Sequence, residues 1–214
     1  MMARALLAAL TVAATASAAA LDIRTEDYRD NATQGAVGAV TGRALAEGLR
    51  PAAPERPVTD VGITLVPRSQ AVLTRLGEIR NRARRDLNAF RTSAGAIVEA
   101  RRAYERALSE VGAADLVRFT VVDAEGRFDV QRIPAGGWLL IAQRAVYTRK
   151  ESSQLSKRER RLFERQPKLT GYYAVTIWLR ELTVSPGSLE VVELTDRNAW
   201  MTAVQEERVL DASP

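Results

Sequence analysis

The period of the apolar residues changes abruptly at Pro67, and this change constrains the fold more than any other feature. Before Pro67, residues 58–66 alternate apolar with polar or small side chains, which is the period of a half-buried strand. After it, apolar residues recur every three or four positions and draw two stripes, each typical of one helix face. The first stripe consists of Val72, Leu76, Ile79, Ala83, Leu87 and Phe90, and the second of Ile97, Tyr104, Leu108 and Val111.

The two stripes are separated by residues 92–95, where Ser93 can cap a new helix and Gly95 weakens a continuous one. A single helix over the whole stretch would carry its far end about 60 Å away, at about 1.5 Å per residue. A chain that leaves one strand and enters its neighbour has to travel out and back. We therefore expect an antiparallel helical hairpin over 69–111, with its turn at 92–95.

The other apolar segments have the character of strands. Residues 46–57 contain three prolines and are expected to form a loop, while 123–126 and 134–137 have the composition of tight turns. The expected strands are 36–45, 58–66, 116–123, 127–130, 138–143, 172–184 and 188–194. This order predicts a mainly β protein with α insertions, an antiparallel β-sandwich over 36–200 that carries the long helical hairpin.

Three segments lie outside this regular pattern. Residues 21–35 are polar, show no period that would bury a face, and are expected to be a flexible lead-in. Residues 149–168 form a second, basic insertion, in which the capping-box spacing of 156–159 predicts a short helix to about residue 165. Residues 201–214 are expected to be a tail.

The first twenty residues have the pattern of a cleaved secretion signal. Arg4 precedes an unbroken run of apolar and small residues over 5–14, and small residues continue to Ala20. The run is shorter than the about 20 apolar residues that a membrane-spanning helix needs. We expect cleavage near Ala18 or Ala20 and a periplasmic or extracellular protein with no transmembrane segment after cleavage.

The chain contains neither cysteine nor histidine. Without cysteine there are no disulfides, thiol nucleophiles or zinc–thiolate sites, so the domain must be held by its own core. Histidine is the usual general base near neutral pH and a frequent metal ligand, so its absence excludes Ser–His and Cys–His catalysis. The sequence indicates no catalytic constellation, no cofactor and no metal, and we expect a non-enzymatic protein.

Two stretches carry a family pattern. One is TDVGITLVP at 59–67; the other is DAEGRFDVQRIPAGGWLLIAQR at 123–144, whose hairpin positions are Asp123, Gly126, Phe128, Ile133, Pro134, Gly137 and Leu139. Together they resemble the carboxypeptidase regulatory-like domains over about half of the chain that follows the signal. The resemblance implies a prealbumin-like (transthyretin-like) β-sandwich, interrupted here by two insertions. It also implies a non-catalytic role, because such domains are usually attachments to enzymes, receptors or surface proteins.

The positive charge of the chain is concentrated in the two insertions. Residues 68–112 contain ten arginines against five acids, and residues 149–168 contain eight lysines and arginines against three acids. Such surfaces can contact anionic lipid headgroups, lipopolysaccharide or acidic glycans, whereas export disfavours nucleic acid. The candidate contacts with an anionic surface are Arg80, Arg84, Arg85, Arg101, Arg102, Lys157, Arg158, Arg160 and Arg161.

A solvated helix face is the alternative interpretation of the charges on the hairpin. Oppositely charged residues four positions apart on a helix stabilise it by a few tenths of a kcal/mol each. The pairs with this spacing are Glu78 with Arg82, Arg82 with Asp86, Arg101 with Glu105, and Arg106 with Glu110.

Two groups of acids have a weak resemblance to functional sites. Asp123, Glu125 and Asp129 could suggest calcium, but an EF-type loop needs more ligands, and two hairpin strands explain these residues better. Glu190 and Glu193 could be imagined as glycosidase carboxylates, although nothing in the sequence marks them as buried or paired.

Four aromatic residues could form a platform for sugar rings. They are Trp138, Tyr172, Tyr173 and Trp178. Aromatic residues on strands more often belong to the core, and the core interpretation is favoured here.

These observations favour an exported, non-catalytic binding or structural module of the cell envelope or periplasm. Its protruding helical hairpin is expected to contact a protein or envelope partner. Two alternatives remain open: an electrostatic binder of anionic envelope lipid or glycan, and a hydrolase that uses carboxylates alone. A hydrolase of that kind requires an acidic pair in a cleft, with at least one raised pKa.

Overall fold

The computed structural model describes residues 21–46, 55–149 and 167–210. The predicted signal peptide and the predicted short helix of the basic insertion lie outside these ranges. Arg149, Pro167 and Lys168, at the two borders of the predicted basic insertion, belong to strands. None of the helices in these ranges is both long and apolar enough to span a membrane.

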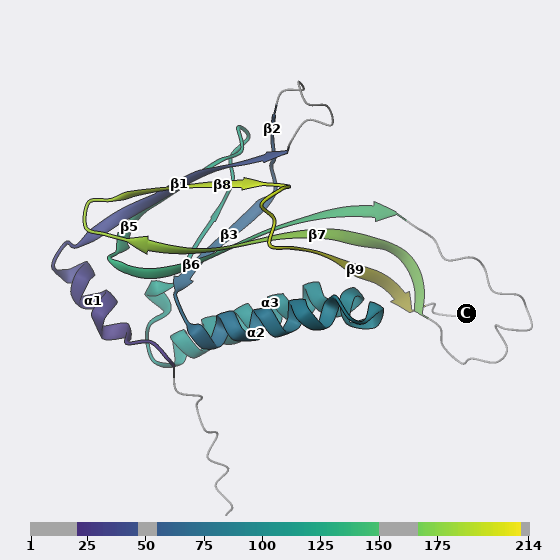
Figure 1. Cartoon of the computed structure of the whole chain (residues 1–214), viewed down its shortest axis with the longest axis horizontal. Coiled ribbons are helices and arrows are strands. Elements are labelled where there is room, and N and C mark those ends of the chain that lie inside the picture. Colours follow the sequence, from purple (N-terminus) through teal and green to yellow (C-terminus); the bar gives the residue numbers. More distant parts are fainter. Residues whose placement is uncertain (1–20, 47–54, 150–166, 211–214) are drawn as a thin grey trace, which may run out of the picture.

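The fold has two β-sheets and a layer of helices (Figure 1). Sheet A is built around β1 (Val37–Ala46), which pairs antiparallel with β5 (Arg127–Pro134) and with the short β2 (Arg56–Pro57). On its other edge, β1 pairs parallel with β8 (Leu189–Thr195). Gly42 is required in β1 because a Cβ there would overlap the backbone carbonyl oxygen of Val192 in β8 and lie 2.5 Å from the ring of Phe128.

Sheet B has five strands in the order β4-β3-β6-β7-β9, and all neighbours are antiparallel. The strands are β3 (Val61–Pro67), β4 (Arg118–Val121), β6 (Gly136–Arg149), β7 (Pro167–Val184) and β9 (Met201–Leu210). The sequence-based expectation of a mainly β, two-sheet antiparallel sandwich is confirmed, with the parallel β1–β8 pair as a departure from it.

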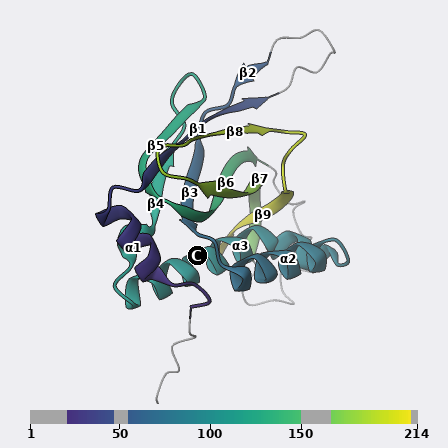
Figure 2. The same ribbon diagram turned by 60° about the vertical axis from the view of Figure 1, so that its left-hand side comes forward.

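The helical hairpin lies between β3 and β4, which are paired neighbours in sheet B. It consists of α2 (Gln70–Ala83) and α3 (Leu87–Glu110), which lie side by side in Figures 1 and 2. The predicted turn at 92–95 was wrong, since α3 runs through these residues without a break. The chain turns at 84–86 instead, where the Asp86 carboxylate accepts a 2.9 Å hydrogen bond from the backbone N–H of Asn88 and caps α3.

Ser93 and Gly95, which were expected to mark the turn, are compatible with the interior of α3. The Ser93 hydroxyl donates a 2.7 Å hydrogen bond to the carbonyl of Phe90, one turn earlier in the same helix, and so does not cap anything. Space around Gly95 is open, because a Cβ there would meet nothing within 4 Å. A single helical glycine costs about 1 kcal/mol relative to alanine, which the packing of α3 can offset.

The hairpin packs on its own sandwich and does not protrude as expected. Arg101 donates to the hydroxyl of Thr64, and the Tyr104 hydroxyl donates a 3.0 Å hydrogen bond to the carbonyl of Pro67. Thr64 is paired with Ile141 across the sheet, so the helices cover the face of sheet B that carries Ile141. The opposite face meets sheet A, as the 2.8 Å bond from the Trp178 indole N–H to the carbonyl of Thr195 shows. The order of layers is therefore sheet A, sheet B, helices.

A helix, α1 (Thr25–Thr33), occupies most of the segment that was expected to be a flexible lead-in. Figure 2 shows it crossing one end of the sandwich. The Tyr28 hydroxyl donates a 2.7 Å hydrogen bond to the carbonyl of Gly137, and its ring meets Trp138 edge-on at 5.4 Å. The Asn31 amide donates a 2.9 Å hydrogen bond to the carbonyl of Ala135. These contacts join positions more than 100 residues apart, which is why no local pattern predicted them.

The prediction that residues 201–214 form a tail was wrong for residues 201–210. These residues form strand β9, which adds to the edge of sheet B. Met201 pairs with Ile177 at one end of β9, and Leu210 pairs with Pro167 at the other. Met201 and Ala203 are buried. A strand with mixed polar residues such as this one is stabilised by the neighbour that it pairs with, and its own sequence carries a weak signal.

If the hairpin is a layer of the core, truncating its inner face must destabilise the whole fold. Leu108 is fully buried and Leu87, on the same helix, is 62% exposed. We expect Leu108→Ala to lower the free energy of unfolding by about 2–5 kcal/mol and Leu87→Ala to change it by less than about 0.5 kcal/mol. Equilibrium denaturation of both variants measures this difference. Equal, small effects would show that the hairpin is an independent appendage.

Candidate binding surface on the helical layer

A groove with a volume of about 610 Å³ opens along the helical layer. It lies between the N-terminal half of α2 and the C-terminal half of α3. Leu21 and Asp22, a few positions before α1, border it as well. Volumes of this size are typical of binding sites. Its lining residues are Leu21, Asp22, Ser69, Ala71, Val72, Arg75, Ala96, Glu99, Ala100, Ala103, Tyr104, Arg106 and Ala107.

The position of α3 explains why the groove has a mostly apolar floor and a charged rim. The inner face of α3 is used by the core, where Ile97, Tyr104 and Leu108 are buried. The alanines of the groove lie on the flank of α3 that borders the start of α2. A methyl side chain leaves open space there, which a longer side chain would fill.

Asp22 closes one end of the groove by capping α2. Its carboxylate accepts a 2.8 Å hydrogen bond from the backbone N–H of Ala71, in the first turn of α2. The hydroxyl of Ser69 also bonds to Asp22 and accepts a 3.1 Å hydrogen bond from the backbone N–H of Val72. Partial burial raises the pKa of Asp22, but these hydrogen bonds outweigh it and hold the pKa below its ordinary value.

Tyr104 contributes a buried wall to the groove and no reactive group. Its hydroxyl is bonded to the carbonyl of Pro67, and burial raises its pKa far above the ordinary value, with smaller contributions from Asp22 and Tyr28. The phenol therefore stays neutral and acts as a hydrogen-bond donor to the backbone.

The rim of the groove carries charges of both signs. Arg75 lies 3.3 Å from Glu78, and Glu99 lies 3.5 Å from Arg102, both as exposed pairs along one helix. Exposed pairs of this kind contribute about 0–1 kcal/mol and exchange partners easily. Arg106 forms no ion pair with any residue of the described ranges, although Glu110 has the spacing for one.

The predicted anion-binding arginines divide into two groups in the structure. Arg80 and Arg101 serve the interior of the protein. The Arg80 guanidinium lies 4.8 Å from the ring centroid of Trp200, as a cation–π contact, and its buried Nε has no hydrogen-bond partner among the described residues. Arg101 is held between Thr64 and Glu105. Both residues are half-buried and already have contacts within the protein.

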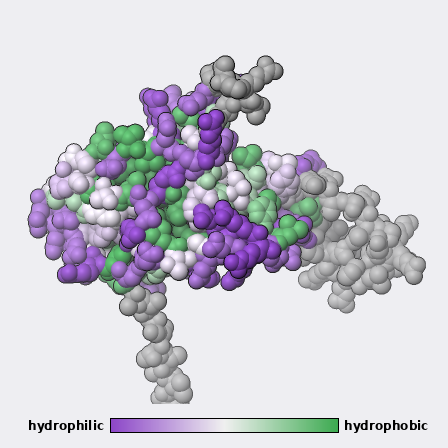
Figure 3. Space-filling view, in the orientation of Figure 1, coloured by the Kyte–Doolittle hydropathy of each residue, from purple (hydrophilic) through white to green (hydrophobic). Residues whose placement is uncertain are grey.

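The other predicted contacts on the hairpin face solvent. Arg84 and Arg85 are exposed in the turn between α2 and α3, and Arg102 is exposed on α3 beside Glu99. Figure 3 shows hydrophilic residues gathered over the helical layer. Lys157, Arg158, Arg160 and Arg161 lie outside the described residues.

Of the four ion pairs that were expected along the hairpin, one is formed within the residues that the structure describes. Arg101 and Glu105 are 3.5 Å apart. Glu99 and Arg102, at a spacing of three, form a pair that was not expected. The charges of α3 are therefore only partly neutralised within the helix.

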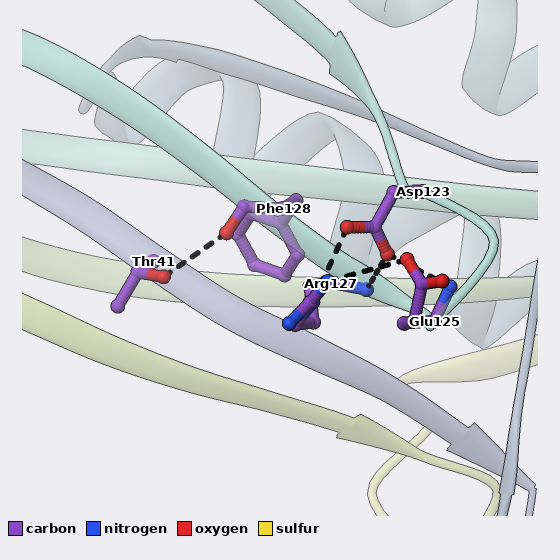
Figure 4. A network of polar contacts seen from close by, with 5 residues as sticks. All are labelled: Thr41, Asp123, Glu125, Arg127 and Phe128. Carbon is purple, nitrogen blue, oxygen red and sulfur yellow. Dashed lines mark hydrogen bonds and ion pairs between the residues drawn. The ribbon is translucent and has the colours of Figure 1, made fainter.

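The acidic cluster at 123–129 is a turn that is stabilised by an internal cation (Figure 4). Asp123 accepts a 2.7 Å hydrogen bond from the backbone N–H of Arg127, and the Arg127 guanidinium contacts both Asp123 and Glu125. The bonds from Arg127 lower the pKa of Asp123. Asp129 accepts from Gln131 instead of joining this cluster. Within the part of the chain that the structure describes, no group of acids could hold a metal ion.

The geometry gives no support to the carboxylate-only hydrolase. Glu190 and Glu193 are three positions apart on β8, so their side chains point to opposite faces of the strand. Among the residues that the structure describes, the carboxyls with shifted pKa values are Asp22 and Asp123, and both pKa values are lowered. A general acid that works near neutral pH needs the opposite shift.

The aromatic residues that were considered as a sugar platform lie mainly in the core. Trp138 and Trp178 are 0% and 2% exposed, and their indole N–H groups donate to the carbonyls of Pro134 and Thr195. The favoured core interpretation is correct for both tryptophans. Tyr172 and Tyr173 are half-buried on β7, and the ring of Tyr173 lies 5.0 Å from that of Tyr147 at a tilt of 53°.

Sequence reasoning missed the groove, although one of its signals was visible. Ala96, Ala100, Ala103 and Ala107 recur every three or four positions, which places small side chains along one side of a helix. The contribution of Leu21 and Asp22 had no local signal, because these residues meet α2 across 49 positions of sequence.

No family model and no curated protein matches this sequence. Three solved structures have a similar course of the chain. A protein from Pseudomonas aeruginosa that was proposed to bind carbohydrate is 19% identical, with a TM-score of 0.41 over 82% of this chain and 99% of that one. The minor pilin GBS52 of Streptococcus agalactiae is 10% identical, with a TM-score of 0.31 over 84% of this chain and 47% of the pilin. The pilus backbone protein RrgB of Streptococcus pneumoniae is 12% identical, with a TM-score of 0.26 over 74% and 40% of the respective chains. At these TM-scores the likenesses assign neither family nor function.

The contact between Asp22 and α2 predicts a pH-dependent stability. Because the folded-state pKa of Asp22 is depressed, the carboxylate stabilises the fold above its unfolded-state pKa of 3.8, and this contribution is lost as the pH falls through the lower folded-state value. We expect Asp22→Asn to lower stability at pH 7 by at most about 1 kcal/mol, with the difference shrinking below about pH 4. Thermal unfolding at pH 7 and pH 3 measures this effect.

Asp129→Asn, on the exposed side of β5, serves as the control and should leave the melting temperature at pH 7 nearly unchanged. An Asp22→Asn deficit that grows at pH 3 would contradict the assignment.

Proposed function

We propose that the chain is an exported, non-catalytic binding or structural module of the cell envelope or periplasm, and that it contacts its partner through the groove of the helical layer. The observation that carries this proposal is that two sides of α3 have different surroundings. Its inner face is buried on sheet B, while its outer side lines an open, mostly apolar groove. The signal-like start and the resemblance to carboxypeptidase regulatory-like domains support the same role.

The lining of the groove favours a polypeptide partner. Its floor of alanines and Val72 offers apolar contact, and its rim offers both acids and arginines within a few residues of each other. A helix or extended segment with an apolar side and mixed flanking charges fits such a surface. Two of its polar donors, the hydroxyls of Tyr104 and Ser69, are already hydrogen-bonded to Pro67 and Asp22.

The proposal predicts that a charge in the floor of the groove abolishes partner binding. Ala103 is an exposed residue on the groove side of α3, and Ser109 is exposed on another side of the same helix. We expect Ala103→Glu to reduce capture of a partner from envelope extract at least about tenfold, since the carboxylate loses water on binding. Ser109→Glu should have little effect.

Both variants keep the core intact, so circular dichroism and melting curves should match those of the unmodified protein. Deleting residues 70–110 is not a suitable test, because it would strip the cover from Leu139 and Ile141. Equal capture by the wild type and by Ala103→Glu would remove the groove as the binding surface.

An electrostatic contact with anionic lipid or glycan is the second candidate. The exposed pair Arg84 and Arg85 at the tip of the hairpin favours it, because neither residue forms an ion pair with the part of the chain that the structure describes. Two exposed cations attract an anionic surface over about one Debye length.

This second candidate makes a separate prediction with its own control. We expect binding to vesicles that contain anionic lipid to fall steeply between about 50 and about 500 mM salt, as the Debye length shortens about threefold. Replacing Arg84 and Arg85 with Glu should abolish sedimentation with the vesicles. The same reversal of Arg43 and Arg56, which are exposed on sheet A, changes the net charge equally and should weaken binding much less. Identical losses in the two double variants would mean that net charge alone governs the contact.

A further inference from the structure

Two charged residues of α3, Glu99 and Arg106, line the groove, and a copy of α3 running in the opposite direction would present these two charges in the complementary order. Going along the helix, Glu99 comes about one turn before Ala103, and Arg106 comes about one turn after it. All three line the groove. A second α3 running in the opposite direction past Ala103 would therefore bring its Arg106 next to Glu99 and its Glu99 next to Arg106.

The two charged residues are free to make such contacts. Glu99 is 64% exposed and engaged only in a loose 3.5 Å pair with Arg102, which is 57% exposed. Arg106 is exposed and has no acidic partner within the described ranges. A parallel arrangement would instead place like charges together, which disfavours it.

The floor of the groove allows the close approach that such a contact needs. Ala96 and Ala103 are exposed and carry only a methyl group, so the backbones of two helices can come within the 8–10 Å typical of packed helices. A contact of this kind is isologous: the same patch of each copy meets the other across a two-fold axis, and it closes without leaving a free surface.

We propose that the partner of the groove is a second copy of this chain, with the two α3 helices antiparallel about Ala103 and with reciprocal Glu99–Arg106 ion pairs between the copies. This inference rests on the proposed function, because it names the partner of the same groove. The module is then a symmetric dimer, in which the two sandwiches lie on opposite sides of a central helical layer.

Charge reversal tests the antiparallel order directly. Glu99→Arg and Arg106→Glu each create two like-charge contacts in the dimer, so each should raise its dissociation constant about tenfold or more. The double variant Glu99→Arg/Arg106→Glu restores opposite charges in both pairs and should return the dissociation constant to within about threefold of the wild type. Asp129→Arg alters the net charge as much as Glu99→Arg does, lies on the far sheet, and should leave dimerisation unchanged.

Sedimentation equilibrium of the full exported chain over a range of concentrations measures all five proteins. Circular dichroism shows whether each one is folded, and exposed sites on a helix tolerate these changes. A wild type that stays monomeric up to about 1 mM would overturn the inference, as would a double variant that dimerises as poorly as the single ones, or single variants that dimerise like the wild type.

The failure of this inference and the failure of the proposed function give different results. If the wild type is monomeric but Ala103→Glu still loses a captured envelope protein, the groove binds another chain and only the inference falls. If the wild type is monomeric and Ala103→Glu captures normally, both fall.

Discussion

The architecture depends on the burial of β6 on both of its faces. Trp138, Leu140 and Ala142 point to one side of this strand and Leu139 and Ile141 to the other, and none is more than 4% exposed. A strand with two apolar faces needs two covers. Sheet A supplies one and the α2–α3 hairpin supplies the other, so the hairpin belongs to the core even though the chain inserts it between two paired strands. The surface left for partners is the outer side of the helices, the exposed side of sheet A, and the strand edges.

This constraint also explains why the arginines of the hairpin do not form one basic surface. A helix that covers a sheet has to place some of its long cationic side chains at the border of the buried face. Arg80 and Arg101 lie there, and each finds an internal partner, the ring of Trp200 and the hydroxyl of Thr64. Arg84 and Arg85 fall in the turn, beyond the sheet contact, and stay exposed. Counting charges along the chain could not separate these two groups, because the separation depends on which face of the helix meets the sheet.

The sequence predicted those features whose cause is local. The alternation in 58–66, the apolar run at 138–143 and the three-to-four-residue spacing after Pro67 all correspond to elements of the predicted kind, although β6 extends six residues beyond the predicted end of its strand. The features that were mispredicted have causes far away in the chain. Helix α1 is fixed by Gly137 and Ala135, and β9 by its pairing with β7. The position of the hairpin turn was local, but Ser93 and Gly95 were given more weight than Asp86, which is the residue that caps α3. The groove could be predicted only in part, because its alanines are periodic while its wall at Asp22 is not.

The turn at 84–86 determines the shape of the groove. With the turn at 92–95, the two helices would have had similar lengths and would have covered each other along their whole extent. The observed turn makes α2 14 residues long and α3 24 residues long, so α3 extends about 15 Å further than α2. The extra length passes beyond the start of α2, and Ala103, Arg106 and Ala107 lie where α2 no longer shields them fully. Leu21 and Asp22 also line the groove. The unequal lengths of the helices thus create an open site at a part of the helical layer where small side chains and charges of both signs occur together.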